Sequence, residues 1–541
     1  MSSFDATRAG TPPQPPARRD LGSDAPSPAV GRRAATWTQA QTAVWLAIVL
    51  IGIVSRAVYV DRGLDHRMLA PWREADYTAI TRNFYRDGLN IFYPQIDWRG
   101  DTPGYAEMEF PLVPWMTALL DRVFGYHEAL LRVPSVLLGI LGVLVFAGLS
   151  RRVLPPAGAL FATAAFAANP LLVILGNAMQ PEPLMLLLTL IAMALIWRWD
   201  DEPRSSTLLA AAGVTAAAIL AKAPAAYLGL VLATVAIRKF GARAFRTGAV
   251  YGAALVALLP PLAWYAWAAR FWVMYGNSLG VSNESHYIGL DMFTPPRFLY
   301  GLLKWETLGV FTPAGWLLAS LALWSRGKAR LAFVWYGAVW VFFLVTARTS
   351  GDNWSFYYHS IAVAPACLLM GAGVGALSAG QVVPSAWGPL CRWQRWIAAL
   401  LAAATLVALA GVTVILIRRR DTQPDLEHMH RCALQFVPYV SPSELIVVHG
   451  GTMVDEYNHP VAHNESMVFA WMDRKGFNYG TQELSVETLD RLAARGGRYW
   501  VVQHDELKRN NLRALVGRRY RRVAACDDGY DLYDLHSRMP P

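Results

Sequence analysis

The chain has 541 residues, of which 54% are hydrophobic and only 16% are charged, whereas soluble domains usually carry about 25% charged residues. This deficit lies in long apolar runs, which excludes an ordinary soluble protein and indicates a polytopic membrane protein. The formal net charge of +10 does not indicate a nucleic-acid partner, because much of the Arg and Lys lies in short loops, where it sets orientation.

The N-terminal residues 1–36 are rich in Pro, Ala, Ser and Arg, and we expect them to form a disordered cytoplasmic tail. They lack the apolar core of a signal peptide, so the first membrane helix is expected to be an uncleaved anchor. We predict a transmembrane catalytic domain over residues 37–420 and a soluble domain over residues 421–541.

The membrane domain is expected to contain about eleven spans, each needing roughly 20 apolar residues or fewer where a helix is buried. The expected spans are 39–59, 129–149, 156–174, 182–198, 206–221, 224–237, 247–268, 308–325, 331–347, 360–379 and 396–417. The least obvious break is at Lys222, because a Lys is costly against lipid and Pro224 suits the start of a new helix.

Basic residues in the loops set the expected orientation. With the tail inside, every inside loop carries Arg or Lys, as the positive-inside rule requires. The exception is residues 418–420, three arginines that fall outside. The odd number of spans places the first loop, 60–128, and the C-terminal domain on the periplasmic face of a bacterial inner membrane.

The C-terminal domain is expected to be α/β. Buried strands are predicted at 445–448 and 499–502, a helix at 505–515 and two closing strands at 521–525 and 530–535. Cys432 and Cys526 both lie here, and pairing in an oxidising periplasm is favoured over two separate buried thiols.

The first loop combines carboxylates with aromatic side chains, which suits the binding of a sugar and the activation of a hydroxyl. Residues 72–85 are predicted to form a short amphipathic helix on the membrane surface. Glu74 and Asp76 lie at its start, where carboxylates are also favoured by the helix dipole alone. A second acidic cluster, Glu107 and Glu109, leads into another short apolar segment at 112–124. The two acidic sites are expected to bracket a polar headgroup.

The residues around Asp76 resemble the acidic motif of glycosyltransferase family 39 in the GT-C superfamily, which includes protein O-mannosyltransferases and lipid A aminoarabinose transferases. The family pattern is Asp-Glu-x-x-Tyr-x-x-Ile. Glu74, Tyr77 and Ile80 match it in register, whereas Arg73 replaces the leading Asp. This departure leaves two candidates for the base, Asp76 first and Glu74 second.

Further motifs of the family are matched in the same order along residues 39–380. They are Glu109 in an acid-proline segment, Arg132 in an Arg-x-Pro-Ser signature, Glu182 between two prolines, Lys222 in a Lys-x-Pro turn, and Tyr358 and His359 in a Tyr-rich turn. The ordered set is specific to the superfamily but not to one donor or acceptor.

The resemblance implies a sugar donor on a polyprenyl phosphate and an acceptor hydroxyl that a carboxylate must deprotonate. It places Asp76, Glu74 and Glu109 as catalytic candidates. The cations Lys222, Arg132 and Arg348 are expected to offset charge on the departing phosphate. The remaining substrate-binding candidates are Glu182, Tyr358, His359 and Tyr77. The alternatives are snorkelling for Lys222, a helix-end anchor for Arg132 and an interfacial belt for Tyr358 and His359.

An anion must accompany Lys222 in its apolar surroundings. Glu182 is one candidate and the donor phosphate, which we favour, is the other. A divalent metal stays open as a cofactor, although no compact ligand set marks a metal site. Asp200, Asp201 and Glu202 resemble a metal-binding triplet, but we interpret them as a solvated inside loop.

Two other functions are compatible with the sequence. A transporter or flippase of lipid-linked glycans would place polar groups at the bilayer midplane and often shows repeated halves, whereas here the acids cluster in one loop near the N-terminus and no repeat is visible. A non-catalytic GT-C scaffold is the other alternative, because Arg73 stands where an acid is usual. The sequence specifies neither the sugar nor whether the acceptor is a lipid, a glycan or a protein.

Overall fold

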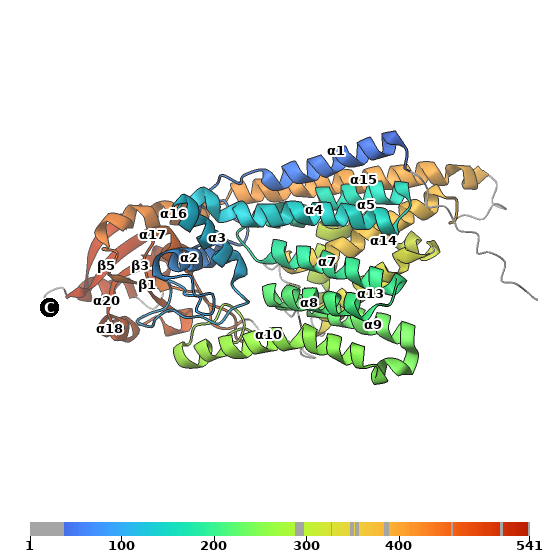
Figure 1. Cartoon of the computed structure of the whole chain (residues 1–541). Helices are drawn as coiled ribbons and strands as arrows, with labels where there is room; N and C mark the ends of the chain where they lie inside the picture. Colours follow the sequence, from blue (N-terminus) through green and yellow to red (C-terminus); the bar gives the residue numbers. More distant parts are fainter. Residues whose placement is uncertain are drawn as a thin grey trace, which may run out of the picture.

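The computed structural model describes residues 37–286, 297–325, 327–346, 351, 356–382, 389–455, 458–508, 512–527 and 529–538. The predicted tail, 1–36, and the candidate Arg348 lie outside these residues. The long helices run side by side as an elongated bundle, and the C-terminal sheet caps one end of it (Figure 1). We refer to this end of the bundle as the capped end.

The bundle is built from thirteen described helices. They are α1 (Gln39–Ala57), α4 (Val133–Val153), α5 (Pro156–Ala168), α6 (Pro170–Leu175), α7 (Glu182–Asp201), α8 (Ser205–Ala221), α9 (Leu228–Phe240), α10 (Gly248–Tyr275), α11 (Arg297–Trp305), α12 (Pro313–Leu321), α13 (Leu331–Val345), α14 (Ser360–Ser378) and α15 (Pro389–Asp421). The expected break at Lys222 is confirmed, since α8 ends at Ala221 and a short 3-10 helix begins at Ala223.

Among the described residues, 8 helices are long and apolar enough to cross a membrane, or 9 if a pair bent by 80° around Thr312 is one span. This is fewer than the eleven expected. The two remaining expected spans correspond to shorter apolar helices, α5 with 13 residues and α8 with 17. Helix α5 is short because Asn169 and Pro170 begin a new helix, α6. The polytopic helical class is confirmed.

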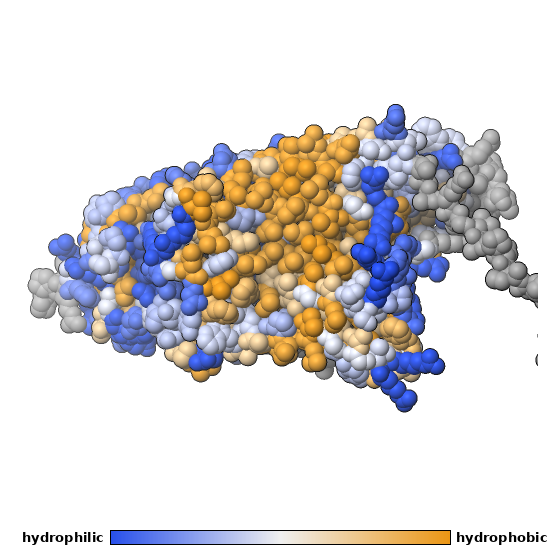
Figure 2. Space-filling model, viewed as in Figure 1, coloured by the Kyte–Doolittle hydropathy of each residue, from blue (hydrophilic) through white to orange (hydrophobic). Residues whose placement is uncertain are grey.

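A broad apolar band covers the middle of the bundle, and hydrophilic surface borders it at both ends (Figure 2). Exposed Leu141, Leu255, Leu262, Leu400 and Ile415 contribute to the apolar surface of the helices. An exposed apolar surface of this extent is stable only in lipid.

Helix α14 lies at the centre of the bundle, and its 18-residue apolar window is entirely buried. It packs against α5 at a point where a Cβ on Gly158 would lie 2.4 Å from the carbonyl oxygen of Gly371. Small residues therefore allow the two backbones to approach closely, as in other membrane helix pairs.

The C-terminal region is a mixed α/β layer. Its sheet has the order β2-β1-β3-β5-β4. Strands β2, β1 and β3 are parallel to one another, and β5 is antiparallel to both of its neighbours, β3 and β4. The strands are β1 (Leu445–His449), β2 (Gly476–Tyr479), β3 (Gly497–Gln503), β4 (Tyr520–Cys526) and β5 (Tyr530–Arg538). The helices are α16 (Pro424–Phe436), α17 (Ser466–Met472), α18 (Val486–Ala494), α19 (His504–Leu507) and α20 (Leu512–Arg519).

The four predicted strands are confirmed as β1, β3, β4 and β5. The predicted helix at 505–515 is wrong in its bounds, because the chain forms α19 and then α20 instead. Cys432 in α16 and Cys526 at the end of β4 form a disulfide with a Cα–Cα distance of 5.4 Å. It fastens α16 to the edge strand of the sheet.

Helices α2 (Pro71–Asp87) and α3 (Leu112–Phe124) of the first loop lie between the bundle and the sheet. The helix at 112–124 is therefore confirmed, but α2 is not an amphipathic surface helix, since all its residues from Glu74 to Phe84 are buried. Helix α17 packs on α2, Ser466 Oγ donates to the Trp72 carbonyl at 2.7 Å, and Arg86 pairs with Asp473 at 2.7 Å. The polar side that should face water is covered by the C-terminal region.

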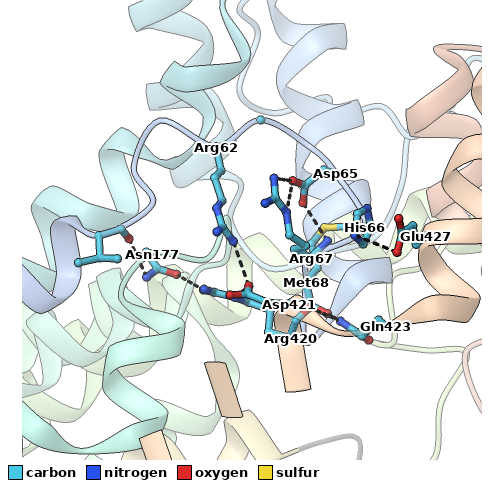
Figure 3. A network of polar contacts seen from close by, with 12 residues as sticks. Arg62, Asp65, His66, Arg67, Met68, Asn177, Arg420, Asp421, Gln423 and Glu427 are labelled. Atoms are coloured by element: carbon cyan, nitrogen blue, oxygen red, sulfur yellow. Dashed lines mark hydrogen bonds and ion pairs between the residues drawn. The ribbon is translucent and has the colours of Figure 1, made fainter. Parts of the chain in front are cut away.

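A polar network fastens the loop after α1 to the junction of α15 and α16 (Figure 3). Arg62 pairs with Asp421 at 3.0 Å, and Arg420 Nη1 donates to Asn177 Oδ1 at 3.4 Å. Gln423 donates to the Met68 carbonyl. Arg420, the last of the three arginines that depart from the positive-inside pattern, is thus buried in protein contacts.

Candidate active site

Two adjoining cavities open at the capped end of the bundle. The smaller one, ≈ 430 Å³, lies between the start of α2 and residues 450–467 of the C-terminal region. The larger one, ≈ 840 Å³, extends from Glu109 past Lys222 to Phe342 and Tyr358. Arg73, Leu279, Gly280 and Glu284 line both cavities, so the two spaces meet at these residues.

Asp76 lines the smaller cavity and is 2% exposed. Trp98 Nε1 donates to its Oδ1 at 2.8 Å, and Asn464 Nδ2 donates to its Oδ2 at 2.9 Å. Burial raises the pKa of Asp76 to about 7, against the hydrogen bond from Trp98 and the charge of Arg73, which lower it. A carboxyl group with this pKa can take up a proton at neutral pH.

Glu74 lies elsewhere, although it is close to Asp76 in sequence. Arg132 Nη1 donates to Glu74 Oε2 at 2.6 Å, and the same guanidinium group binds the carbonyls of Arg62 and Asn177 at 3.0 and 2.9 Å. Neither Glu74 nor Arg132 is among the described residues that line the two cavities. The ion pair of Glu74 and Arg132 is therefore a buried contact that braces α2 against the bundle.

Arg73, the departure from the family motif, lies where the two cavities meet. Its Nη1 is 3.6 Å from Glu109 Oε1, and Tyr77 donates a hydrogen bond of 2.9 Å to the same oxygen. Glu109 lines the larger cavity, whereas the Tyr77 side chain is 1% exposed and packs behind it. At the position of the motif's leading Asp, this chain therefore has a cation, Arg73, which the carboxylate of Glu109 holds in place.

Lys222 lines the larger cavity, where its ammonium group contacts Glu182. Its Nζ also lies over two aromatic rings, 4.5 Å from the centroid of Tyr357 and 5.5 Å from that of Tyr358. The structure therefore shows Glu182 as the anion beside Lys222. Since an ammonium group has three donors, Lys222 has further capacity toward the cavity.

His359 is placed away from both cavities. It is fully buried in the bundle, where its Nδ1 is 2.8 Å from Glu306 Oε1. Tyr336 donates to the other oxygen of Glu306 at 2.6 Å. This polar group joins α13, the 3-10 helix that precedes α14 (Phe356–His359) and the π-helix Glu306–Phe311. Sequence reasoning that placed His359 beside its neighbour Tyr358 did not account for the helical rotation between them.

Glu107 anchors a loop that lines the two cavities. Ser278 Oγ and Ser282 Oγ donate to its two carboxylate oxygens at 2.7 and 2.8 Å. These bonds hold the loop at 277–286, which carries Gly280 and Glu284 to the junction of the cavities. The two acids of the second cluster therefore differ: Glu109 lines the larger cavity, whereas Glu107 anchors the loop.

The residues that sequence reasoning missed come from outside the first loop. Asn464 and Glu465, at the start of α17, form the far wall of the smaller cavity, and Glu284 and Tyr357 complete it. Burial raises the pKa of Glu465 to about 8, against the backbone hydrogen bond from Met467, and the charge of Asp76 raises it further. No pattern in the sequence connects residue 465 with residue 76.

No cluster in the described part of the chain is a convincing metal site. One group, His428 with Cys432 and Cys526, has suitable spacing, but its two sulfurs form the disulfide. Asp200 pairs with Arg238, and Asp201 pairs with Arg152 and Lys328 at 3.0 and 2.6 Å. Asp200 and Asp201 are therefore the last residues of α7 and not part of the expected loop, and they tie this helix to the ends of α4 and α9 at the end of the bundle opposite the cap.

Comparison with known proteins supports the resemblance found in the sequence. Residues 102–267 match the family described as dolichyl-phosphate-mannose-protein mannosyltransferase. No curated protein matches the chain. These 166 residues include Glu107, Glu109, Arg132, Glu182 and Lys222.

Three solved structures share the fold over most of the chain. ArnT from Cupriavidus metallidurans bound to undecaprenyl phosphate is 18% identical, with a TM-score of 0.54 over 92% of this chain and 98% of that one. The apo form gives 17% identity, a TM-score of 0.56, and 91% and 97% coverage. The oligosaccharyltransferase AglB from Archaeoglobus fulgidus, in complex with an inhibitory peptide and a dolichol-phosphate, gives 11% identity, a TM-score of 0.51, and 86% and 69% coverage.

Proposed function

We propose that this chain, a GT-C glycosyltransferase related to family 39, transfers a sugar from a polyprenyl phosphate to an acceptor hydroxyl at the capped end of the bundle. The observation that carries the proposal is the pair of adjoining cavities. One holds a cation suited to a phosphate, Lys222, the other holds a carboxyl group suited to a base, Asp76, and Arg73 lies between them.

The larger cavity suits the donor. Much of its wall is apolar, including Leu279, Val281 and Phe342, while Lys222 and Arg73 provide positive charge. A polyprenyl phosphate combines an apolar chain with one anionic group, and charge-assisted hydrogen bonds from ammonium and guanidinium groups favour that anion. Undecaprenyl phosphate in the ArnT structure and dolichol-phosphate in the AglB structure are ligands of this chemical class.

The reaction follows from the position of Asp76. The acceptor oxygen attacks the anomeric carbon of the sugar while Asp76 takes the hydroxyl proton. A C–O bond to the acceptor forms, the bond between the anomeric carbon and the phosphate oxygen breaks, and the bonding electron pair leaves on the polyprenyl phosphate. Lys222 and Arg73 offset the charge that grows on that oxygen. Attack from the side opposite the phosphate inverts the anomeric centre.

The smaller cavity favours an acceptor without negative charge. Four acidic residues line it, namely Asp76, Glu284, Asp455 and Glu465, and Arg73 is the single Arg or Lys among its described lining residues. A phosphate acceptor would meet repulsion there, and its ionised oxygen would not need a base such as Asp76. An alcohol of a glycan, a lipid or a Ser or Thr side chain has that proton.

The proposed orientation places residues 1–36 in the cytoplasm and the C-terminal region, 421–541, outside the inner membrane of a bacterium. Polyprenyl-linked donors would then be used on the outer face, where the first loop at 60–128 meets the C-terminal region. Residues 37–420 form the catalytic membrane domain in this arrangement. The basic loops at the uncapped end, which contain Arg152, Arg238 and Lys328, support it.

A direct test measures release of polyprenyl phosphate by purified protein from a panel of polyprenyl-phosphate pentoses and hexoses, by mass spectrometry, with glycan, lipid and peptide alcohols as acceptors. We expect release that depends on an acceptor and on Asp76. A transporter would move these lipids between leaflets of vesicles without cleaving them. A non-catalytic scaffold would bind them and release nothing from any of the panel.

A further inference from the structure

The C-terminal region reaches into the smaller cavity instead of only covering it. Gly450, Thr452, Asn464, Glu465 and Met467 all line this space, opposite Trp72 and Asp76 of α2. Asn464 Nδ2 donates to Asp76 Oδ2 at 2.9 Å, across 388 residues of chain. The wall formed by residues 464 and 465 is therefore placed directly against the proposed base.

Glu465 is held in this wall by the start of α17. Its side chain caps that helix, and Oε1 accepts a hydrogen bond of 3.3 Å from the Met467 amide. The next residue, Ser466, donates to the Trp72 carbonyl at 2.7 Å, so the cap is fastened to α2 on both sides of Glu465. The carboxyl group consequently has a fixed place beside Asp76 in the cavity.

We propose that Glu465 is a positioning residue that retains a proton during the reaction, so that Asp76 is the carboxyl group that ionises and acts as the base. The role rests on the proposed function. Two carboxyl groups that line the same cavity and are largely removed from solvent do not readily ionise together, and the proton remains on one of them. Asp76 receives two side-chain hydrogen bonds, from Trp98 and Asn464, which favour its charged form.

The surroundings of the two acids support this division. Burial gives Glu465 a pKa of about 8 and Asp76 a pKa of about 7. Arg73 favours the charge on Asp76, whereas Asp97 opposes it. The other charged or titratable groups near this wall, among the described residues, are Glu284, Asp455 and Tyr357, which line the cavity, and Tyr530 of β5, which interacts with Glu465.

The arrangement predicts two limbs in the pH profile of kcat/KM. Activity rises with pH as Asp76 ionises near pH 7. It falls again as Glu465 loses its proton near pH 8, because the two carboxylates then repel each other and disturb the Asn464 contact that positions Asp76. In Glu465→Gln the amide reproduces the neutral acid, so the falling limb should vanish while the rising limb remains.

The matched control is Glu487→Gln on α18, an exposed acid of the same region, which should keep both limbs. A falling limb that persists unchanged in Glu465→Gln would overturn the inference. So would a rising limb lost together with it, because that result would show Glu465 to be required for more than its proton.

A second readout does not depend on turnover. Dicyclohexylcarbodiimide adds to protonated carboxyl groups and leaves an N-acylurea that mass spectrometry locates. With a pKa of about 8, labelling of Glu465 in the wild type should fall about 30-fold between pH 7 and pH 9.5. Equal labelling at the two pH values, or none at pH 7, would overturn the inference. Correct labelling in a protein that transfers no sugar would instead reject the proposed function.

Discussion

Replacing Asp76 with Asn removes the proposed base while changing little else. The Asn oxygen can still accept from Trp98 Nε1, which now donates at 2.8 Å. The new amide group would face the Asn464 amide, which donates at 2.9 Å in the wild type, and a turn of the Asn464 amide restores a donor–acceptor pair. The expected loss of folding stability is therefore about 1 kcal/mol or less.

The expected loss of activity is much larger. A positioned general base contributes about 10²–10⁴ in rate, which corresponds to roughly 3–5 kcal/mol in the activation barrier. Asp76→Asn should therefore lower kcat by at least about 100-fold at pH 7.5 with donor affinity nearly unchanged. Because the pKa of Asp76 is about 7, wild-type kcat/KM should also fall about tenfold per pH unit below pH 6, and the variant should lack this fall.

The assay follows release of polyprenyl phosphate from pH 5 to pH 9, and thermal unfolding of each variant is measured in the same detergent. Asp87→Asn at the partly exposed end of α2 is a control that keeps the wild-type profile. Asp76→Asn with more than a tenth of wild-type turnover, or with the wild-type acid limb, would refute the assignment of the base.

Three further variants separate structural from chemical roles. Glu74→Gln leaves the buried guanidinium of Arg132 without its carboxylate, so the free energy of unfolding should fall by about 3–5 kcal/mol. Turnover per folded molecule should stay within a few-fold of the wild-type value, and an unchanged unfolding temperature would contradict this role. Lys222→Ala leaves Glu182 buried and unpaired and should lower the unfolding temperature. The double variant Lys222→Ala, Glu182→Gln should recover the unfolding temperature, but undecaprenyl phosphate should not stabilise it. If the lipid stabilised Lys222→Ala and the wild type equally, the phosphate contact would be excluded. Because folded Glu465 keeps its proton up to a pKa of about 8, whereas the unfolded chain loses it near the ordinary value of 4.5, its contribution to stability falls as pH rises from about 4.5 to 8 and levels off above. The unfolding temperature of Glu465→Gln relative to the wild type should therefore increase from pH 5 to pH 8, and a constant difference would contradict a raised pKa.

The sequence predicted those features that depend on local composition. Apolar runs and proline positions located the helices, including the break at Lys222 and the helix at 112–124. Short runs rich in β-branched and aromatic residues located four of the five strands. The strand at Gly476–Tyr479 was missed because four residues beginning with Gly carry little strand signal.

Contacts between distant segments were beyond local reasoning. The helix at Pro71–Asp87 was expected on a membrane surface because nothing in its own residues shows that α17 covers it. The same limit applies to the site. The family motifs matched Glu74 and Lys222, and Asp76 was chosen because it supplies an acid three residues after Arg73. The motifs did not distinguish the buried brace of Glu74 and Arg132 from the cavity wall, and they gave no sign of Glu465.

The most direct test of the two-cavity arrangement is a density map of the protein with undecaprenyl phosphate bound. We predict phosphate density in the larger cavity within hydrogen-bond distance of Lys222 and Arg73, with the isoprenoid chain extending along the apolar wall toward Phe342 and the smaller cavity, beside Asp76, still open. Phosphate bound away from both cations, or a lipid that fills the space beside Asp76, would contradict the assignment of donor and acceptor sites.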